Sequence, residues 1–220
     1  MSAAQQLDLP PVTFQEYLDY EDLAEVRHEI WNGALVAMAG TSEEHVDVAS
    51  NLSGELFQEL KDSSCRIGGS DQLVYQPSRD KGVYPDITIT CEPREYVQDG
   101  KNRDRALLNP TLIVEVLSKS TALRDLGPKR EGYLAIPSLK EYVLVDPTTP
   151  WVRTLLRAGG GWLETTVTDP AASVRFESVN VTVPMADIYR GIAVAEVSTV
   201  VDWQADDDAA RPSGRHVTRQ

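Results

Sequence analysis

The sequence predicts an α/β fold with a mixed sheet, organised as one domain within its 220 residues. Helical patterns come early along the chain, and segments rich in Val, Ile, Thr and aromatic residues dominate later. In addition, "TLIVEVL" and "EYVLVDP" are typical of strands, and a helical segment separates them. Such a strand–helix–strand crossover favours a parallel pair, so we expect a mixed sheet with flanking helices and additional antiparallel strands toward the C-terminus.

The N-terminal part predicts a helix and a hairpin. Residues 1–12 contain "LPPV", which cannot form regular helix, and we expect them to be an N-terminal extension. Thr13 and Glu16 form a capping-box pattern at the start of a short helix. Further on, Asn32-Gly33 lies between the apolar-rich arms of "VRHEIWNGALVAMAG", which is a strong hairpin signal because both turn residues must accept positive φ.

A longer helix is expected in "TSEEHVDVASNLSGELFQELKDSS". This segment begins with a capping pattern and carries a stripe at helical spacing. The stripe consists of His45, Ala49, Leu52, Leu56 and Leu60. The strands predicted downstream are "CRIGGSDQLVYQ", "VYPDITITCE", "TLIVEVL", "EYVLVDP", "WVRTLLRAG", "WLETTV" and "ASVRFESVNVTV".

Pro128 fixes the place of the crossover helix. Proline is tolerated only in the first turn of a helix, so we expect a helix over about residues 126–136, with Asp125 as its N-cap. Lys129 would then project from the opening turn, beside the end of the "TLIVEVL" strand.

The chain ends in two segments of different character. A short helical turn around "MADIYRG" is expected to close the domain, which we place at residues 13–192. Residues 193–220 combine an acidic run with almost no apolar content and predict a flexible tail.

Composition and charge exclude several classes of protein. No apolar run is long enough for a membrane span, and the start lacks a basic region followed by an apolar one, so we expect a cytoplasmic location. Cys65 and Cys91 have no neighbouring Cys or His at metal-ligand spacing, which argues against a zinc site and a disulfide-stapled scaffold. The net charge of -13 counts against a plain DNA-binding module, because polyanions are repelled unless a basic surface or a metal intervenes.

Two acidic residues stand out because their surroundings are those of buried strands. Asp86 lies in "GVYPDITITCEP" and Glu115 in "PTLIVEVLSKST", where a carboxylate is costly to bury without a partner. If the two strands pair, the carboxylates converge at one edge of the sheet, and a divalent cation would relieve their desolvation and mutual repulsion. Oxygen ligands with open positions suit Mg²⁺ or Mn²⁺.

Two further residues could complete such a site. The ammonium group of Lys129 could stabilise charge on a phosphoryl oxygen, or help to orient and deprotonate an attacking water. Glu29, on the first arm of the hairpin, could complete the metal shell or position the water.

Each of these residues alone has a simpler interpretation. Asp86 could belong to an inert Pro-Asp turn, and Glu115 could face solvent from an edge strand. Lys129 could be a solvated helix residue, and Glu29 could pair with a basic neighbour on the hairpin. His45 lies on the apolar stripe, where a core or edge histidine is the first interpretation and a role beside the metal the second. Only their joint occurrence favours a catalytic site.

Six motifs in order carry a resemblance to a known family: "TFQEYLDY", "RHEIWNGALVAM", "VYPDITIT", "LIVEVLSKST", "RDLGPKREGY" and "KEYVLVDP". Together, over roughly residues 13–190, they resemble the Uma family of restriction-endonuclease-like proteins, within the PD-(D/E)xK nuclease superfamily. The resemblance implies a restriction-endonuclease-like α/β core.

The resemblance also implies a set of catalytic residues. By position, the metal ligands would be Glu29, Asp86 and Glu115. The superfamily's usual lysine two residues past the glutamate is absent, since Leu117 stands there. As in the family pattern, the lysine lies on the following helix, which makes Lys129 the candidate.

The expected activity is Mg²⁺- or Mn²⁺-dependent endonucleolytic hydrolysis of nucleic acid, with DNA as the expected substrate and a homodimer as the expected assembly. Accessory roles are assigned to His45 and to Asp125, which would steady Lys129. Phosphate contacts are assigned to Lys119, Arg124 and Arg130, which would form a positive rim. Lys119 stands where many relatives have proline.

Two other functions remain open from the sequence. The first is a catalytically inactive protein of the same fold that serves as an interaction or regulatory module, for which the negative charge would be no handicap. The second is a metal-dependent enzyme that acts on RNA or on a smaller phosphate compound.

Overall fold

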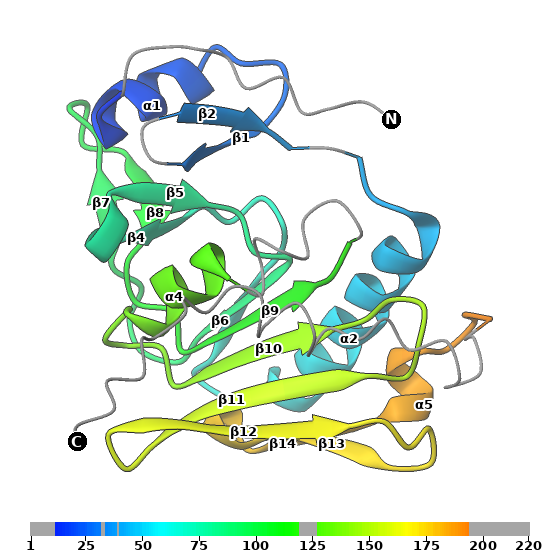
Figure 1. Ribbon diagram of the computed structural model, residues 1–220. Helices are drawn as coiled ribbons and strands as arrows, with labels where there is room; N and C mark the ends of the chain where they lie inside the picture. The colour runs from blue at the N-terminus through cyan, green and yellow to red at the C-terminus, as the bar shows by residue number, and fades with distance from the viewer. Residues whose placement is uncertain (1–11, 32–33, 39, 119–126, 194–220) are drawn as a thin grey trace, which may run out of the picture.

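A six-stranded mixed sheet forms the centre of the molecule (Figure 1). The computed structural model describes residues 12–31, 34–38, 40–118 and 127–193, so most of the predicted extension and tail lie outside the description. The sheet order is β12-β11-β10-β9-β6-β3, and β9 and β10 run parallel whereas the other neighbours are antiparallel. Its strands are β3 (Arg66–Gly68), β6 (Ile87–Thr90), β9 (Leu112–Val116), β10 (Glu141–Val145), β11 (Val152–Ala158) and β12 (Gly161–Val167). The predicted mixed α/β fold and its parallel crossover are confirmed.

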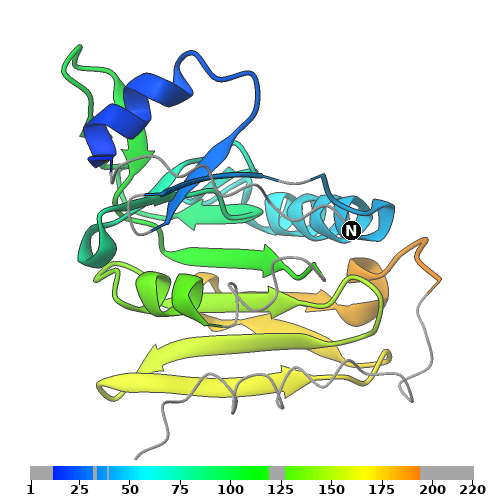
Figure 2. The same ribbon diagram turned by 45° about the horizontal axis from the view of Figure 1, so that its top comes forward.

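The sheet is covered on both faces (Figure 2). One face packs against α2 (Glu43–Leu60), α5 (Met185–Ile188) and the hairpin of β13 (Ser173–Phe176) and β14 (Val181–Pro184). The other face packs against α4 (Pro128–Leu134). Because side chains alternate along a strand, β9 sends Leu112, Val114 and Val116 to the first face and Ile113 to the second. Glu115 therefore faces α4.

A smaller layer carries the N-terminal elements. It contains the four-stranded sheet β5-β4-β8-β7 and the two-stranded hairpin β1-β2. Its strands are β1 (His28–Trp31), β2 (Ala34–Ala37), β4 (Val74–Gln76), β5 (Lys81–Val83), β7 (Tyr96–Gln98) and β8 (Asp104–Leu107). α1 (Phe14–Glu21) packs on this layer through Phe14, Tyr17 and Leu18. Two short 3-10 helices, η1 (Pro77–Arg79) and η2 (Glu177–Val179), complete the described elements.

Several local predictions are confirmed. Thr13 is the N-cap of α1, with both halves of the capping box formed with Glu16. β1 and β2 pair with Trp31 opposite Ala34, although the turn residues 32–33 lie outside the described residues. In α2 the buried side chains are His45, Val48, Leu52, Leu56 and Leu60, close to the predicted stripe.

Other predictions are corrected by the structure. The helix predicted over 126–136 begins at Pro128, and its N-cap is Gly127 rather than Asp125, because a proline at the first position fixes the start. The segment predicted as one strand from "CRIGGSDQLVYQ" splits into β3 and β4, which belong to different sheets. β5, β7 and β8 were not predicted.

The two cysteines form a disulfide, contrary to the prediction from their spacing. Cys65 and Cys91 lie 26 residues apart along the chain. In the antiparallel pair of β3 and β6, Arg66 stands opposite Thr90, so the cysteines occupy the next cross-strand position. The register of the two strands brings the cysteines together, and their spacing in the sequence does not indicate it.

No helix in the described part of the chain is long and apolar enough to span a membrane.

Candidate active site

The pairing of β6 with β9 brings Asp86 beside Glu115. Ile87 stands opposite Val114 in this antiparallel register, so Asp86 and Glu115 occupy the adjoining cross-strand position. The amide of Val116 donates a hydrogen bond of 2.7 Å to Asp86 Oδ2. The pairing on which the two-carboxylate hypothesis depends is therefore present.

Lys129 lies between two carboxylates. Its Nζ is 2.8 Å from Glu115 Oε1 and 3.0 Å from Glu29 Oε1. The three side chains are almost fully buried, with 7% of Lys129, 5% of Glu115 and 9% of Glu29 exposed. Isolated charges at this depth would cost several kcal/mol each, so the ammonium and the carboxylates depend on one another. β1, β9 and α4 each supply one member of this triad.

Backbone and phenol donors hold the triad in place. The Tyr133 hydroxyl donates a 2.7 Å hydrogen bond to Glu115 Oε1, and the Tyr84 amide donates a 3.2 Å bond to Glu29 Oε1. Burial is the main cause that raises the pKa of Tyr133 well above its usual value, and the negative charge of Glu115 raises it further. The phenol therefore keeps its proton and acts as a donor. The Gln76 side-chain amide donates a 3.2 Å bond to the carbonyl of Lys129.

Three residues around the triad were not predicted from the sequence: Tyr133, Tyr84 and Gln76. Tyr133 has a signal in hindsight, since it follows Lys129 by one helical turn and therefore lies on the same face of α4. Gln76 lies on β4, on another sheet, and nothing in its local sequence connects it with the site.

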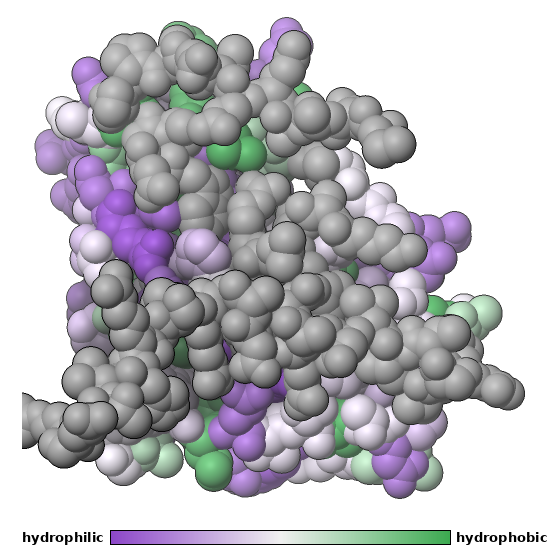
Figure 3. Space-filling view, in the orientation of Figure 1, coloured by the Kyte–Doolittle hydropathy of each residue, from purple (hydrophilic) through white to green (hydrophobic). Residues whose placement is uncertain are grey.

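Lys81 is a further buried lysine close to the triad. Only 1% of this residue is exposed. Burial, and next the charge of Arg79, lower the pKa of Lys81 to about 8. The negative charge of Glu29 acts to raise this pKa, but these larger effects oppose it. Arg79 itself pairs with Glu131 of α4. On the face seen in Figure 3, hydrophilic residues gather around η1, the element that carries Arg79.

His45 contacts the site from α2. Its Nε2 lies 3.4 Å from Asp86 Oδ2, and 9% of its side chain is exposed. The hydroxyl of Ser42, the N-cap of α2, accepts a hydrogen bond from the His45 amide, which stabilises the first turn of the helix. The histidine thus belongs both to the buried stripe of α2 and to the surroundings of Asp86.

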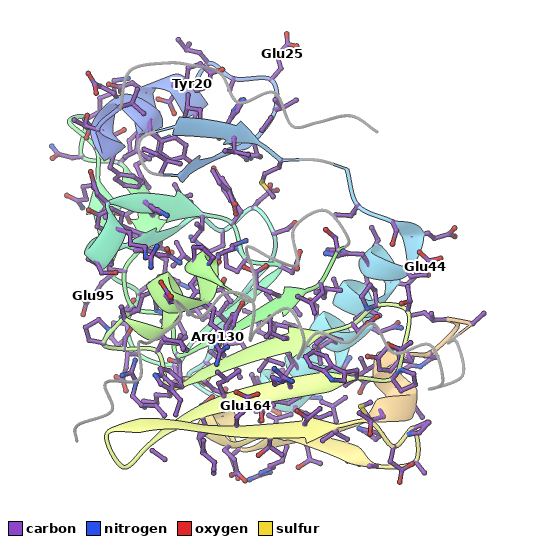
Figure 4. The ribbon with its side chains drawn as sticks, viewed as in Figure 1. Tyr20, Glu25, Glu44, Glu95, Arg130 and Glu164 are labelled. Carbon is purple, nitrogen blue, oxygen red and sulfur yellow. A yellow bond between two sulfur atoms is a disulfide. The ribbon has the colours of Figure 1, made fainter. Side chains whose placement is uncertain are left out.

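The residues assigned to phosphate contacts are only partly described. Lys119, Arg124 and Asp125 lie outside the described residues. Arg130 lies on α4 next to Lys129, and its guanidinium is 3.4 Å from Glu164 of β12, which Figure 4 shows beneath it.

The contacts of Glu29 and Glu115 differ from the simpler interpretations of these two residues. Glu29 pairs with Lys129 rather than with a hairpin neighbour, since His28 pairs with Glu21 and Arg27 with Asp71. The face of β9 that carries Glu115 is covered, with Glu115 itself 4% exposed.

The donor set suits a cation that takes few protein ligands. Asp86 Oδ1 has no hydrogen-bond partner among the described residues, and its side chain is 16% exposed. Within the same residues, no group of three or more His, Cys, Asp or Glu side chains forms a metal cage. Mg²⁺ is commonly held by one or two carboxylates together with water and phosphate oxygens, which Asp86 and Glu115 fit.

Comparisons with known proteins agree with this fold. The family model of Uma2, described as "Putative restriction endonuclease", matches residues 14–186. "Uncharacterized protein slr1290" from Synechocystis is 32% identical over 84% of this chain and 94% of its own length. "Uncharacterized protein sll1609" from the same organism is 32% identical over 77% of this chain and 95% of its own length.

A solved structure also shares the fold. A "putative nuclease belonging to DUF820" from Anabaena variabilis superposes with a TM-score of 0.62 at 16% identity, covering 81% of this chain and 97% of that one. Since the family match spans most of the sequence and both relatives exceed 30% identity, the chain belongs to the Uma2 family of restriction-endonuclease-like proteins.

Proposed function

We propose that this chain is a metal-dependent endonuclease that hydrolyses phosphodiester bonds of nucleic acid, with DNA as its substrate. The observation that carries the proposal is the buried Lys129, which Glu115 and Glu29 share, with the partly exposed Asp86 at the cross-strand position opposite Glu115. Buried ionisable groups that converge from separate elements are concentrated at functional sites. The description of the family supports a nuclease.

In this proposal Asp86 and Glu115 hold Mg²⁺ or Mn²⁺. When bound, the metal supplies Lewis acidity, which lowers the pKa of water and offsets charge on the phosphate. The Lys129 ammonium stabilises the charge that develops on the phosphoryl oxygens. Glu29 shares the Lys129 ammonium with Glu115, which brings its carboxylate to the edge of the proposed metal shell, where it would complete the shell or position the ammonium.

The surrounding residues have supporting roles. Tyr133 orients Glu115 through its 2.7 Å hydrogen bond, and His45 orients Asp86 from 3.4 Å. Arg130, together with Lys119 and Arg124, would provide the phosphate contacts that a chain of net charge -13 needs near its site. We further propose a homodimer, which sedimentation would test.

Cleavage assays with matched variants test this function. Wild-type protein with Mn²⁺ should cleave duplex DNA, and chelation of the metal should abolish cleavage. Asp86→Asn should lower the rate at least about a hundredfold, because the metal loses a charged ligand. Asp19→Asn, which removes the charge of an exposed residue on α1, should leave the rate unchanged.

The same assay separates the other functions. Single-stranded DNA, RNA and a small phosphodiester would be compared with the duplex, and preference for RNA or the small compound would contradict the assignment to DNA. If Mn²⁺ neither promotes cleavage of any substrate nor raises the melting temperature, the chain acts as an interaction module and the proposed activity is wrong.

A further inference from the structure

A basic cavity lies at the opposite end of α2 from the candidate active site. It has a volume of about 450 Å³ and is lined by the end of α2, the start of β3 and Arg94. An adjoining cavity of about 280 Å³ shares Ser64, Arg66 and Arg94 with it. His45 and Leu60 lie at opposite ends of the helix, which separates this cavity from Asp86 by about 22 Å along the α2 axis.

The charge of this cavity differs from that of the whole chain. Its lining contains Lys61, Arg66 and Arg94 and no acidic residue, and Glu92 lines only the adjoining cavity. Across the described residues, no carboxylate lies within ion-pair distance of these three cations. These three cations therefore form a local positive charge on a chain of net charge -13.

Arg94 carries a second sign of an absent partner. Its Nε is buried and has no hydrogen-bond partner among the described residues. Most buried donors are satisfied, and a guanidinium is a planar fork that matches the oxygens of a phosphate. Arg94 as a whole is half-buried, so an anion in the cavity would meet its guanidinium from the exposed side rather than at Nε.

Two other features suit a nucleotide phosphate rather than a bare anion. Phe57 lines the same cavity and is 60% exposed, so its ring is open to stacking by a base. In addition, the Cys65–Cys91 disulfide ties together the segments that carry Arg66 and Arg94. This link restrains the two backbone segments from which Arg66 and Arg94 line the cavity.

We propose that this cavity binds a phosphate group of a nucleotide or of a nucleic-acid strand. Arg66 and Arg94 contact the phosphate oxygens, Lys61 adds charge, and Phe57 stacks on the neighbouring base. The assignment does not depend on the endonuclease activity proposed above. A nucleic-acid strand and a free nucleotide present the same chemistry, and the experiment separates them.

Binding is measured in metal-free buffer, where the proposed hydrolysis cannot occur. The probes are inorganic phosphate, adenosine monophosphate and a fluorescent twelve-nucleotide DNA strand. Arg94→Gln and Arg66→Gln should each weaken binding of the strand at least about tenfold, since each removes a charge-assisted hydrogen bond. Each should also lower the slope of log affinity against log salt by about 0.7, the contribution of one phosphate contact on a single strand.

Matched variants give the controls. Arg175→Gln removes the same charge from an exposed arginine on β13 and should leave affinity nearly unchanged. Arg94→Lys keeps the charge without the planar fork and should lose less than Arg94→Gln. Phe57→Leu should weaken binding of the two nucleotide probes and spare inorganic phosphate. Far-UV circular dichroism and melting temperatures confirm that the variants fold.

The outcomes separate the sources of the phosphate. Arg94-dependent binding of adenosine monophosphate supports a free nucleotide, and such binding of the strand alone supports a nucleic-acid backbone. The proposal is overturned if no probe binds in an Arg94-dependent way, or if Arg175→Gln weakens binding as much. Loss of metal-dependent cleavage with binding intact would contradict only the proposed endonuclease activity.

Discussion

Charged side chains are buried and paired near one end of β6, whereas those near its other end have no carboxylate partner among the described residues. Asp86, just before the strand, adjoins a triad in which Glu29, Glu115 and Lys129 are buried and paired. Cys91, just after the strand, adjoins a basic cavity whose arginines have no carboxylate partner among the described residues. Burial requires each charge of the triad to have a partner, whereas solvent lets the arginines remain unpaired until a ligand arrives.

This difference predicts different consequences of substitution. At the triad, removal of one group leaves an uncompensated buried charge, so stability and activity change together. At the basic cavity, removal of a charge should alter binding with little effect on stability. The disulfide is the exception, because it crosslinks the chain at this otherwise solvated end.

The largest effect is expected at Lys129. Lys129→Met should cost about 3–5 kcal/mol of unfolding free energy, because Glu29 and Glu115 lose their shared cation. Urea unfolding measures the loss. Lys140→Met, at an exposed position, should change stability by no more than about 0.5 kcal/mol.

A double variant sharpens that prediction. Adding Glu29→Gln to Lys129→Met should cost less than the sum of the two single changes, with a coupling of about 0.5–3 kcal/mol. Strict additivity would show that the two groups do not depend on each other.

Removal of the disulfide comes next in size. Cys65→Ser should lower the unfolding free energy by about 3.5 kcal/mol in the loop-entropy description, since the bond closes a loop with a sequence separation of 26. Metal-dependent cleavage should persist, because the bond lies at the other end of β6. A thiol reductant should lower the melting temperature of the wild type and leave the variant unaffected; an unresponsive wild type would contradict the crosslink.

The Tyr133 hydroxyl should have a smaller effect. Tyr133→Phe removes the 2.7 Å hydrogen bond to Glu115 and should cost about 1.5–3 kcal/mol, the usual range for a bond to a charged group. Tyr20→Phe, at an exposed tyrosine, is the matched control. Equal losses in thermal or chemical unfolding would exclude a specific role for the buried phenol.

A pH dependence of stability is expected at Lys81. Its pKa is lowered to about 8 in the folded protein from 10.5, so the unfolded chain binds more protons between these values. Stability of the wild type relative to Lys81→Met should therefore rise as pH increases from 8 to 10.5, and it should be flat below that range. Urea unfolding at pH 7, 8 and 9.5 measures this difference, and a difference that falls with pH would contradict the shift.

The sequence predicts strongly patterned elements well. The capping box at Thr13, the stripe of α2 and the parallel crossover from β9 to β10 follow from local periodicity and turn chemistry. The proximity of Glu29, Glu115 and Lys129 was also expected, from the placement of the helix that begins near Pro128 and from the family resemblance. The six motifs, taken together in their sequence order, point to a candidate active site that none of them would indicate alone.

The remaining features depend on tertiary register. β7 and β8 have three and four residues, too few to show a periodicity that distinguishes strand from loop. The Cys65–Cys91 bond follows from how β3 aligns with β6, and the contact of Gln76 with Lys129 joins β4 to α4. No local pattern encodes either contact.

The central claim is that Asp86 and Lys129 act in one site. Its most direct test is the rate of Mn²⁺-dependent DNA cleavage by Asp86→Asn, Lys129→Met and the double variant. Groups that act as a unit give non-additive losses, so the double variant should be no slower than the slower single variant. Losses that multiply in the double variant, or full activity in either single variant, would contradict the account.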